Sequence, residues 1–458
     1  MRLAYPALAL LALVGCRGKD ITFDCENQAL EFNKQSDAKI EPLLAEIPNK
    51  GPFPVAIQIS GAGLNKLLAS VISEGAPFAG TVPFALTAYG PSDATFAPTS
   101  APQIILSETP GCKNCVRFHL DFGVELSAPE MAVSSGVGFV DLFIPVRLDV
   151  DPANKTSTLV AEYGNATIAP DGPDCSSDNP TACGFYLLVY GFESTEHTMV
   201  AGALKRFMEE DIAADFDDVE LLTVGSWQIG DGQMELLAEK IEIQPANDKI
   251  VLGMHTNLPL APGVGLDTTQ PLLPGSVMTL AMDPRIMLPM AYRMLDEGHI
   301  ARTYDEEGQP DPHGIYGLTL EDITVHEEEP GMDIPDRFDC TFRVWRTDEG
   351  YCGNAKAVMP LVLEKMPPAL GLTFKAGDAE LLEGQGFGAA ALKEDELVDE
   401  NQDLIDRFRK DLTEQMKDTV NFSAIDLADS DIVFSMQDAE LTATALTTYL
   451  DFVVVASE

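Results

Sequence analysis

The predicted order of strands and helices occurs twice in this chain, once on each side of a proline- and glycine-rich segment at residues 258–276. Each half begins with a strand that runs into an amphipathic helix, continues with several short strands and a second helix, and ends with a hairpin. A repeat of about 200 residues indicates two similar modules and excludes a solenoid of short repeats. We therefore expect a first module at residues 51–257, a linker at residues 258–276 and a second module at residues 277–458.

The first module opens with a predicted strand at residues 55–59. From Ser60 onward, apolar residues recur at the spacing of one helix face, and a second amphipathic helix is expected at residues 198–216. Short apolar runs broken by Pro, Gly and Asp predict an antiparallel sheet between these helices, and a hairpin follows at residues 236–257. The sheet runs are residues 103–107, 116–126, 137–150, 157–168 and 185–192.

The second module repeats this plan from a predicted strand at residues 277–282. Asp283 is a predicted N-cap, and Pro284 occupies the first position of a helix that ends near Gly298. A late helix is expected at residues 401–419, and a final hairpin at residues 431–455. The sequence therefore predicts an α+β fold of two tandem modules. The strand runs between the two helices are residues 315–325, 340–345, 357–364 and 370–374.

The N-terminus is typical of an exported lipoprotein. Residues 1–15 combine Arg2 with a short apolar run, which is the composition of a signal peptide and too short for a membrane span. Leu13-Val14-Gly15-Cys16 resembles a bacterial lipobox, so we expect Cys16 to be lipidated and residues 16–50 to form an acylated tether at the outer membrane. An ordinary secretory signal remains the alternative.

The chain is strongly acidic. It has 29 Lys and Arg residues against 73 Asp and Glu residues, a formal net charge of −44. Nucleic-acid binding depends on Lys and Arg contacts to phosphates, so this composition excludes a nucleic-acid partner. It also disfavours adsorption to anionic membrane surfaces, and we interpret the charge as a means of keeping the protein soluble.

Six of the eight cysteines form three pairs that are close in sequence, which suits an oxidising compartment. Loop disulfides are the leading interpretation of these pairs. A redox motif or half of a zinc site remains possible at the first pair, although His119 alone does not complete a zinc site. Cys25 stays unassigned. The three candidate disulfides are Cys112–Cys115, Cys175–Cys183 and Cys340–Cys352.

The start of each module resembles the tubular lipid-binding (TULIP) superfamily, which includes bactericidal/permeability-increasing protein. The phrase Ile59-Ser60-Gly61-Ala62-Gly63-Leu64 is similar to the "I-S-x-x-G-L" phrase at which a strand of that family turns into a long helix, and residues 278–298 look like the opening of its second module. The resemblance implies two modules in an elongated, boomerang-like arrangement. In each module a strongly twisted antiparallel sheet wraps around long amphipathic helices.

The same resemblance implies a slot for acyl chains or another hydrophobic ligand between the helices and the sheet of each module. Its walls would be the apolar helix faces, with methionines that adapt to chains of different shape. An ordinary packed helix core is the plain alternative. The candidate lining residues are Leu64, Leu67, Leu68, Val71, Leu204, Phe207, Met208, Ile286, Met287, Met290, Met294, Leu404, Ile405, Phe408 and Leu412.

One feature departs from the family. Its lipopolysaccharide-binding members use a basic tip to meet phosphates, whereas this chain has only Lys66, Lys113 and Arg117 in the matching region. We therefore expect a neutral or zwitterionic lipid, a sterol, or a lipid bridged by a divalent cation. The partners expected are this hydrophobic ligand and the membrane that holds the acyl anchor.

Known catalytic motifs are absent from the sequence. There is no Gly-x-Ser-x-Gly elbow, no His-Glu-x-x-His motif and no phosphate-binding loop, so we expect no enzyme activity and no cofactor. Asp171, Asp174 and Asp178 lie close enough in sequence to gather around calcium, but an acidic chain contains such clusters by chance. Two other function classes stay open: a surface adhesion lipoprotein with solid modules, and an envelope hydrolase whose catalytic residues are scattered in sequence.

Overall fold

A computed structural model gives the fold of most of the chain. The structure describes residues 27, 30, 31, 33–35, 38, 53–71, 79–86, 90–108, 111, 112, 114–128, 134–154, 156–190, 194–208, 218–224, 227–229, 232–234, 236–256, 258, 264–307, 309–326, 337–348, 351–365, 372–388, 405, 406, 408–410, 425, 426 and 431–455. The expected signal peptide, Cys16 and Cys25 lie outside these residues.

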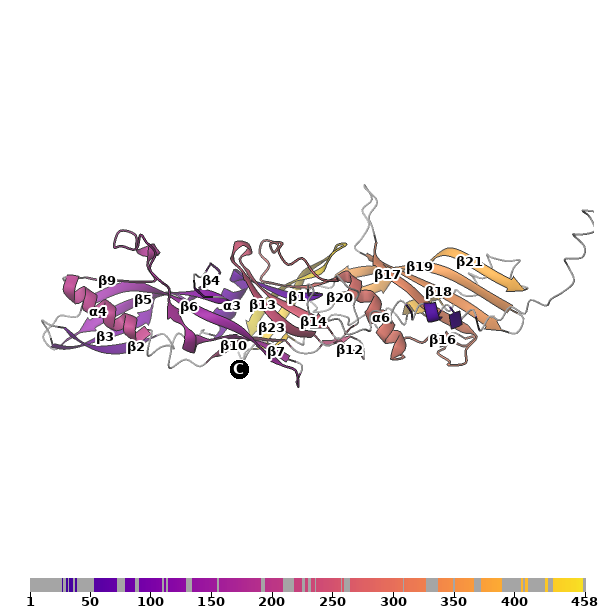
Figure 1. Cartoon of the computed structure of the whole chain (residues 1–458), viewed down its shortest axis with the longest axis horizontal. Coiled ribbons are helices and arrows are strands. Elements are labelled where there is room, and N and C mark those ends of the chain that lie inside the picture. The colour runs from indigo at the N-terminus through magenta and orange to yellow at the C-terminus, as the bar shows by residue number, and fades with distance from the viewer. Residues whose placement is uncertain are drawn as a thin grey trace, which may run out of the picture.

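A six-stranded antiparallel sheet joins the two halves of the chain at the centre of an elongated molecule (Figure 1). Its order is β13-β14-β1-β15-β24-β23, so three strands come from each half. The opening strands β1 and β15 lie side by side, with Val55 opposite Met282 and Ile59 opposite Met278. The bounds are β1 (Val55–Ser60), β13 (Leu236–Gln244), β14 (Lys249–Thr256), β15 (Met278–Met282), β23 (Asp431–Leu441) and β24 (Leu446–Val455).

This strand order reflects the duplication that the sequence suggests. In each half the opening strand pairs with the second strand of the closing hairpin, as in β1 with β14 and β15 with β24. The two halves of the sheet are therefore related by an approximate two-fold axis between β1 and β15. Every residue of β1 and β15 is buried, as expected of strands that are covered on both faces.

A ten-stranded sheet forms the body of the first half (Figure 1). It follows the order β2-β3-β5-β6-β7-β10-β22, and β4, β8 and β9 pair beside this path. Its last strand, β22 (Ile425–Asp426), comes from the second half and pairs with β10. The other bounds are β2 (Gly80–Leu86), β3 (Gly90–Pro98), β4 (Gln103–Ile105), β5 (Cys115–Ser127), β6 (Ser134–Asp151), β7 (Thr156–Ala161), β8 (Thr167–Ile168), β9 (Phe185–Val189) and β10 (Val219–Val224).

A second six-stranded sheet forms the body of the second half, at the other end of the molecule (Figure 1). Its order is β16-β17-β18-β19-β20, and β21 pairs with β19. A small two-stranded sheet of β11 (Trp227–Ile229) and β12 (Gly232–Met234) completes the strands. The bounds are β16 (Thr303–Tyr304), β17 (Tyr316–Val325), β18 (Arg337–Asp348), β19 (Tyr351–Lys365), β20 (Leu372–Ala376) and β21 (Glu380–Gly388).

The described parts of the helices are shorter than the family resemblance implies. α3 (Gly61–Val71), α4 (Ser194–Phe207) and α6 (Met287–Asp296) have 11, 14 and 10 residues. Of the expected late helix at residues 401–419, five described residues are helical, at 405, 406 and 408–410. In the part of the chain that the structure describes, no helix has the length and apolarity required to cross a membrane. Among the described residues the fold is therefore two sheet-dominated modules, and the long helices that the resemblance implies are not shown there.

Both opening strands pass into helix through a polar cap, which the sequence predicts for Asp283. Ser60 Oγ accepts the Gly63 N–H at 3.0 Å, which is an N-cap bond for α3. Asp283 Oδ1 accepts the Arg285 N–H at 3.0 Å and caps a 3₁₀ turn at Pro284–Ile286 that leads into α6. These equivalent caps lie at the ends of β1 and β15, where each strand is followed by a helix.

Two of the three candidate disulfides are present. Cys112 is bonded to Cys115, and Cys175 is bonded to Cys183. The pairing of Cys340 with Cys352 is wrong, because the β18–β19 register places Cys340 opposite Met359 and Cys352 opposite Thr347. Seven residues of extended strand separate the two positions, about 23 Å. Cys340 is a free, fully buried thiol, and burial raises its pKa above the ordinary value.

The buried thiol gives a prediction about reactivity. Cys340 is expected to resist a maleimide probe in the folded protein, because attack requires an exposed thiolate. In urea the same thiol is expected to react at the rate of a free cysteine. Peptide mapping after labelling identifies the modified residue, and Cys340→Ala provides the control. Full labelling of Cys340 without denaturant contradicts the burial described here.

Candidate functional site: the apolar interior

The candidate lining residues that the structure describes lie in the interior of the molecule. In α3, Leu64, Leu67 and Leu68 are buried, and the α3 stripe lies against β1 and β4. The helix is held there because Asn65 Nδ2 donates to the Ile104 carbonyl at 2.9 Å, and Asn65 Oδ1 accepts the Ile104 N–H at 2.5 Å. The side chain of Val71 lies outside the described residues.

The second helix of the first half covers the far end of the ten-stranded sheet (Figure 1). Leu204 and Met208 are buried, whereas Phe207 is half-buried. The Phe207 ring packs edge to face on Phe96 of β3, with 5.4 Å between ring centroids. α4 and α3 thus both place apolar side chains against the same sheet.

In the second half, α6 supplies a wall rich in sulfur. Ile286, Met287, Met290 and Met294 are all buried. The hydroxyl of Tyr292 donates to the Leu320 carbonyl at 2.7 Å, which fixes this helix against β17. Thioether side chains are flexible and polarisable, so methionines fill irregular gaps in an apolar interior.

The late helix contributes to the same interior where it is described. Ile405 and Phe408 are buried, and the Phe408 ring lies 5.0 Å from the Phe342 ring of β18, centroid to centroid. Leu404 and Leu412 lie outside the described residues. The described candidate residues on the helices are therefore buried, except for the half-buried Phe207.

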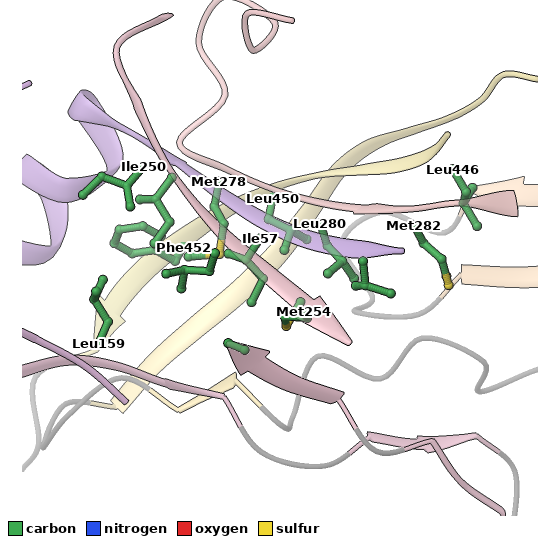
Figure 2. Close-up of a cluster of buried hydrophobic side chains, with 14 of the residues drawn as sticks. Ile57, Leu159, Ile250, Met254, Met278, Leu280, Met282, Leu446, Leu450 and Phe452 are labelled. Carbon is green, nitrogen blue, oxygen red and sulfur yellow. The ribbon is translucent and has the colours of Figure 1, made fainter. Parts of the chain in front are cut away.

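The inner face of the central sheet connects the two interiors, and sequence reasoning missed its role. Figure 2 shows side chains of β1, β14, β15 and β24 gathered on this face, with Leu159 of β7 across from them. The sequence signal that could have identified this face was the alternation of apolar residues along each strand, because every second residue of a strand lies on the same face of the sheet. The labelled residues are Ile57, Leu159, Ile250, Met254, Met278, Leu280, Met282, Leu446, Leu450 and Phe452.

These residues and the helix stripes form one continuous buried cluster that includes residues of all three large sheets. Nine of the 16 methionines belong to it. Met254, Met278 and Met282 lie on the central sheet, between the α3 side and the α6 side. The arrangement is one continuous apolar interior that extends through both halves, not two separate cores.

A charged cluster with a buried aspartate crosses β5 and β6. His119 and Asp141 are opposite each other in the sheet, with His119 Nδ1 2.7 Å from Asp141 Oδ1, and Arg117 forms an ion pair with the other carboxylate oxygen. The hydrogen bond to Asp141 raises the pKa of His119 against the opposing effect of burial. Burial alone would raise the pKa of Asp141, but hydrogen bonds from His119 and Arg117 outweigh it and hold that pKa below the ordinary value.

A similar pair lies at the β17–β18 end, where His326 Nδ1 is 2.5 Å from Asp339 Oδ2 and Arg337 is within hydrogen-bond distance of the ring. Among the residues that the structure describes, neither His119 nor His326 hydrogen-bonds a serine or cysteine. These pairs therefore lack the nucleophile–base contact that a serine or cysteine hydrolase requires.

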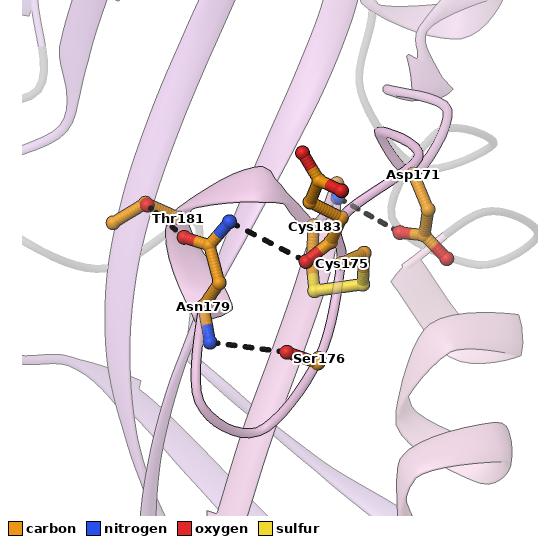
Figure 3. Close-up of a disulfide and its surroundings, with 8 residues drawn as sticks. Asp171, Cys175, Ser176, Asn179, Thr181 and Cys183 are labelled. Carbon is orange, nitrogen blue, oxygen red and sulfur yellow. Dashed lines mark hydrogen bonds between the residues drawn. A yellow bond between two sulfur atoms is a disulfide. The ribbon is translucent and has the colours of Figure 1, made fainter.

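The acidic loop closed by Cys175–Cys183 is organised by its own hydrogen bonds (Figure 3). Asp171 Oδ1 accepts the Gly184 N–H at 2.9 Å, and the Asn179 side chain donates to the Asp174 carbonyl at 3.4 Å. Asp171, Cys175 and Cys183 approach one another closely, but both sulfurs are committed to the disulfide and cannot act as thiolate ligands. The disulfide and the hydrogen bonds within the loop therefore hold it in a defined conformation.

No protein-family model and no curated protein sequence matches this chain. Two solved structures are similar to it along most of its length. One is a lipopolysaccharide binding protein, with a TM-score of 0.40 and 10% identity over 89% of this chain and 100% of that chain. The other is P47 of Clostridium botulinum E1, with a TM-score of 0.43 and 9% identity over 88% of this chain and 99% of that chain.

Proposed function

We propose that the protein is an envelope lipoprotein that holds acyl chains, or a hydrophobic ligand of similar shape, in the interior of its two modules. The observation that supports this most is the continuous apolar cluster that runs from the helix stripes of one half, across the central sheet, to α6. Each methylene transferred from water to such an interior contributes about 0.8 kcal/mol, so binding requires no catalytic group.

The methionines favour the interpretation that the interior holds a ligand, rather than the alternative of a rigid packed core. Leu and Ile have defined rotamers and specify one packing, whereas Met accommodates several. The buried Met287, Met290 and Met294 lie on one helix beside the methionines of the central sheet. We propose that an occupant enters where these side chains give way, and that the tether of residues 16–50, acylated at Cys16, keeps the carrier at the outer membrane.

The direct test is to identify what the protein carries. Full-length protein is extracted from membranes in mild detergent, and its bound lipids are analysed by mass spectrometry. Uptake of a fluorescent fatty acid is then measured by titration. We expect co-purified lipid and saturable uptake. Absence of both contradicts the proposal and favours the adhesion alternative, in which the modules are solid.

A substitution among the buried methionines of α6 tests whether the ligand binds beside this helix. Met290→Trp adds a rigid ring at a buried position of α6, whereas Met199→Trp adds the same ring at an exposed position of α4. Excluding two methylenes of an acyl chain costs about 1.6 kcal/mol, so we expect about tenfold weaker fatty-acid binding for Met290→Trp and no change for Met199→Trp.

Circular dichroism and urea unfolding establish that both variants are folded before binding is compared. Met290→Leu, which conserves volume, is expected to retain binding. Equal affinity for a folded Met290→Trp variant and for Met199→Trp contradicts a ligand site beside α6.

A further inference from the structure

A polar cavity lies on the opposite face of the central sheet from the apolar interior. Strand alternation that turns Ile57 and Leu280 inward turns their neighbours Gln58 and Thr279 outward. The register aligns Gln58 with Thr279, and Thr279 with Tyr449 of β24. A parallel row carries Ala281, Thr447 and Glu440. These polar residues come from both halves of the chain.

The segment between the two halves covers this face. The Leu266 N–H donates to the Phe53 carbonyl at 2.9 Å, and the Gly265 N–H donates to Asp283 Oδ2 at 2.7 Å. Farther along, Asn247 Nδ2 donates to the Thr269 carbonyl at 2.8 Å, and Lys249 Nζ donates to the Gln270 carbonyl. The segment is thus fastened on both sides of a cavity of about 390 Å³, a volume within the range of small-molecule sites.

One of the residues that line the cavity has a side-chain hydroxyl without a hydrogen-bond partner among the described residues. Thr279 is completely buried, lines the cavity, and its Oγ1 has no hydrogen-bond partner in the described part of the chain. Buried hydroxyls are nearly always paired. Beside it, Gln58 Oε1 accepts from Lys249 Nζ at 2.6 Å, and this bond orients the amide so that its NH₂ group is left for another acceptor.

The charged groups define the kind of ligand. Asp267 and Glu440 are among the residues that line the cavity, whereas Lys249 does not line it and its ammonium is bonded to Gln58 and to the covering segment. The phenol of Tyr449 donates to Glu440 Oε2 at 3.0 Å. A cavity with carboxylates in its lining and no cation among its lining residues disfavours anions. It favours a molecule that donates hydrogen bonds.

We propose that this cavity binds a small neutral saccharide. Sugar hydroxyls both donate and accept, which matches the carboxylates of Asp267 and Glu440 together with the Thr279 hydroxyl and the Gln58 amide. The apolar C–H face of a sugar ring would pack against apolar residues of the cavity lining, namely Leu266, Pro271 and Leu272. This site is separate from the apolar interior and does not depend on the lipid proposal.

The test uses saturation-transfer NMR of the full chain with glucose, galactose, N-acetylglucosamine and sucrose. Saturation of at least one sugar is expected for the unmodified protein. Thr279→Val keeps the side-chain shape and removes the unpaired hydroxyl, so we expect at least tenfold weaker sugar binding with an unfolding midpoint that is unchanged or higher. Thr95→Val, at an exposed position of β3, is the matched control and is expected to change neither quantity.

Three results overturn the proposal. The first is saturation of none of the four sugars by the unmodified protein. The second is equal binding by Thr279→Val, which places the sugar elsewhere. The third is a lower unfolding midpoint for Thr279→Val, which shows that the hydroxyl is already paired in the free protein. Fatty-acid uptake is measured on the same samples, so that a failure of this site is distinguished from a failure of the lipid proposal.

Discussion

Gly63→Ala is expected to destabilise the protein by about 2–3 kcal/mol, although it adds a single methyl group. Gly63 lies in the first turn of α3, where a Cβ atom would stand 2.2 Å from the Val277 carbonyl oxygen and 3.2 Å from Ile59 Cγ2. The same carbonyl accepts the Ser60 N–H at 3.0 Å. A methyl group here forces the start of α3 away from the backbone that enters β15, and this contact joins the two halves of the chain.

Gly202→Ala is the matched control, since it makes the same change in the helix α4. Among the described residues, no atom beyond the backbone of α4 itself lies within 4 Å of the Cβ position there. The variant is therefore expected to be more stable by about 0.5–1 kcal/mol, because alanine favours helix over glycine. Urea unfolding followed by circular dichroism measures both variants. A loss below 1 kcal/mol for Gly63→Ala shows that the α3–β15 junction accommodates a side chain, and contradicts the close approach described above.

The glycine also explains why the strand-to-helix phrase was informative in the sequence. Ser60 caps the helix and Gly63 permits the close approach, so the residue types at this junction follow from local geometry. The same holds for Asp283 and Pro284 at the start of the second half. Local rules of capping and periodicity therefore predicted the order of elements and the two-module plan.

The pairing of strands that are far apart in the chain could not be predicted from the sequence in the same way. Alternation shows which residues of a strand share a face, but it does not show which strand lies beside it or what covers that face. The pairing of β1 with β15, and of β10 with β22, joins the halves across hundreds of residues. Cys340 and Cys352 illustrate the limit, because they are close in sequence and yet lie at distant positions of one long hairpin.

The polar cavity was missed for the same reason. The linker composition, rich in proline and glycine, indicated a connection between modules. Its fastening to Phe53, Asn247 and Lys249 depends on tertiary contacts that composition does not encode. Lys249 is the clearest example, because a fully buried lysine in a strand has no signature in sequence alone.

Asp141→Asn is the second substitution with a large expected effect, a loss of about 2–3 kcal/mol. Removing one partner of a buried ion pair typically costs about 3–5 kcal/mol, and the partial exposure of Arg117 and His119 lowers this figure. Asp149→Asn, on the same strand, is the control. Asp149 is about half exposed where it pairs with Arg147, so its loss is expected to stay below about 1 kcal/mol.

The cluster also predicts a pH dependence with a definite sign. The pKa of His119 is raised from 6.5, so its stabilisation is complete below pH 6.5 and is lost as the pH rises through the folded-state pKa. The pKa of Asp141 is lowered from 3.8, so its stabilisation is present above pH 3.8 and is lost as the pH falls through the lower, folded-state pKa. The contribution of the pair is therefore greatest between about pH 4 and 6.5.

Urea unfolding at pH 5.0, 6.5 and 8.0 tests this window. The unmodified protein is expected to lose stability between pH 6.5 and 8.0, and most of this loss is expected to disappear in Asp141→Asn, where only the more distant Asp121, 3.4 Å from His119 Nε2, still favours the imidazolium. Asp149→Asn is expected to keep the full pH dependence, since Asp149 does not face His119. An equal slope in all three proteins shows that the His119–Asp141 contact does not couple to folding. In that case the cost of Asp141→Asn comes from Arg117 alone.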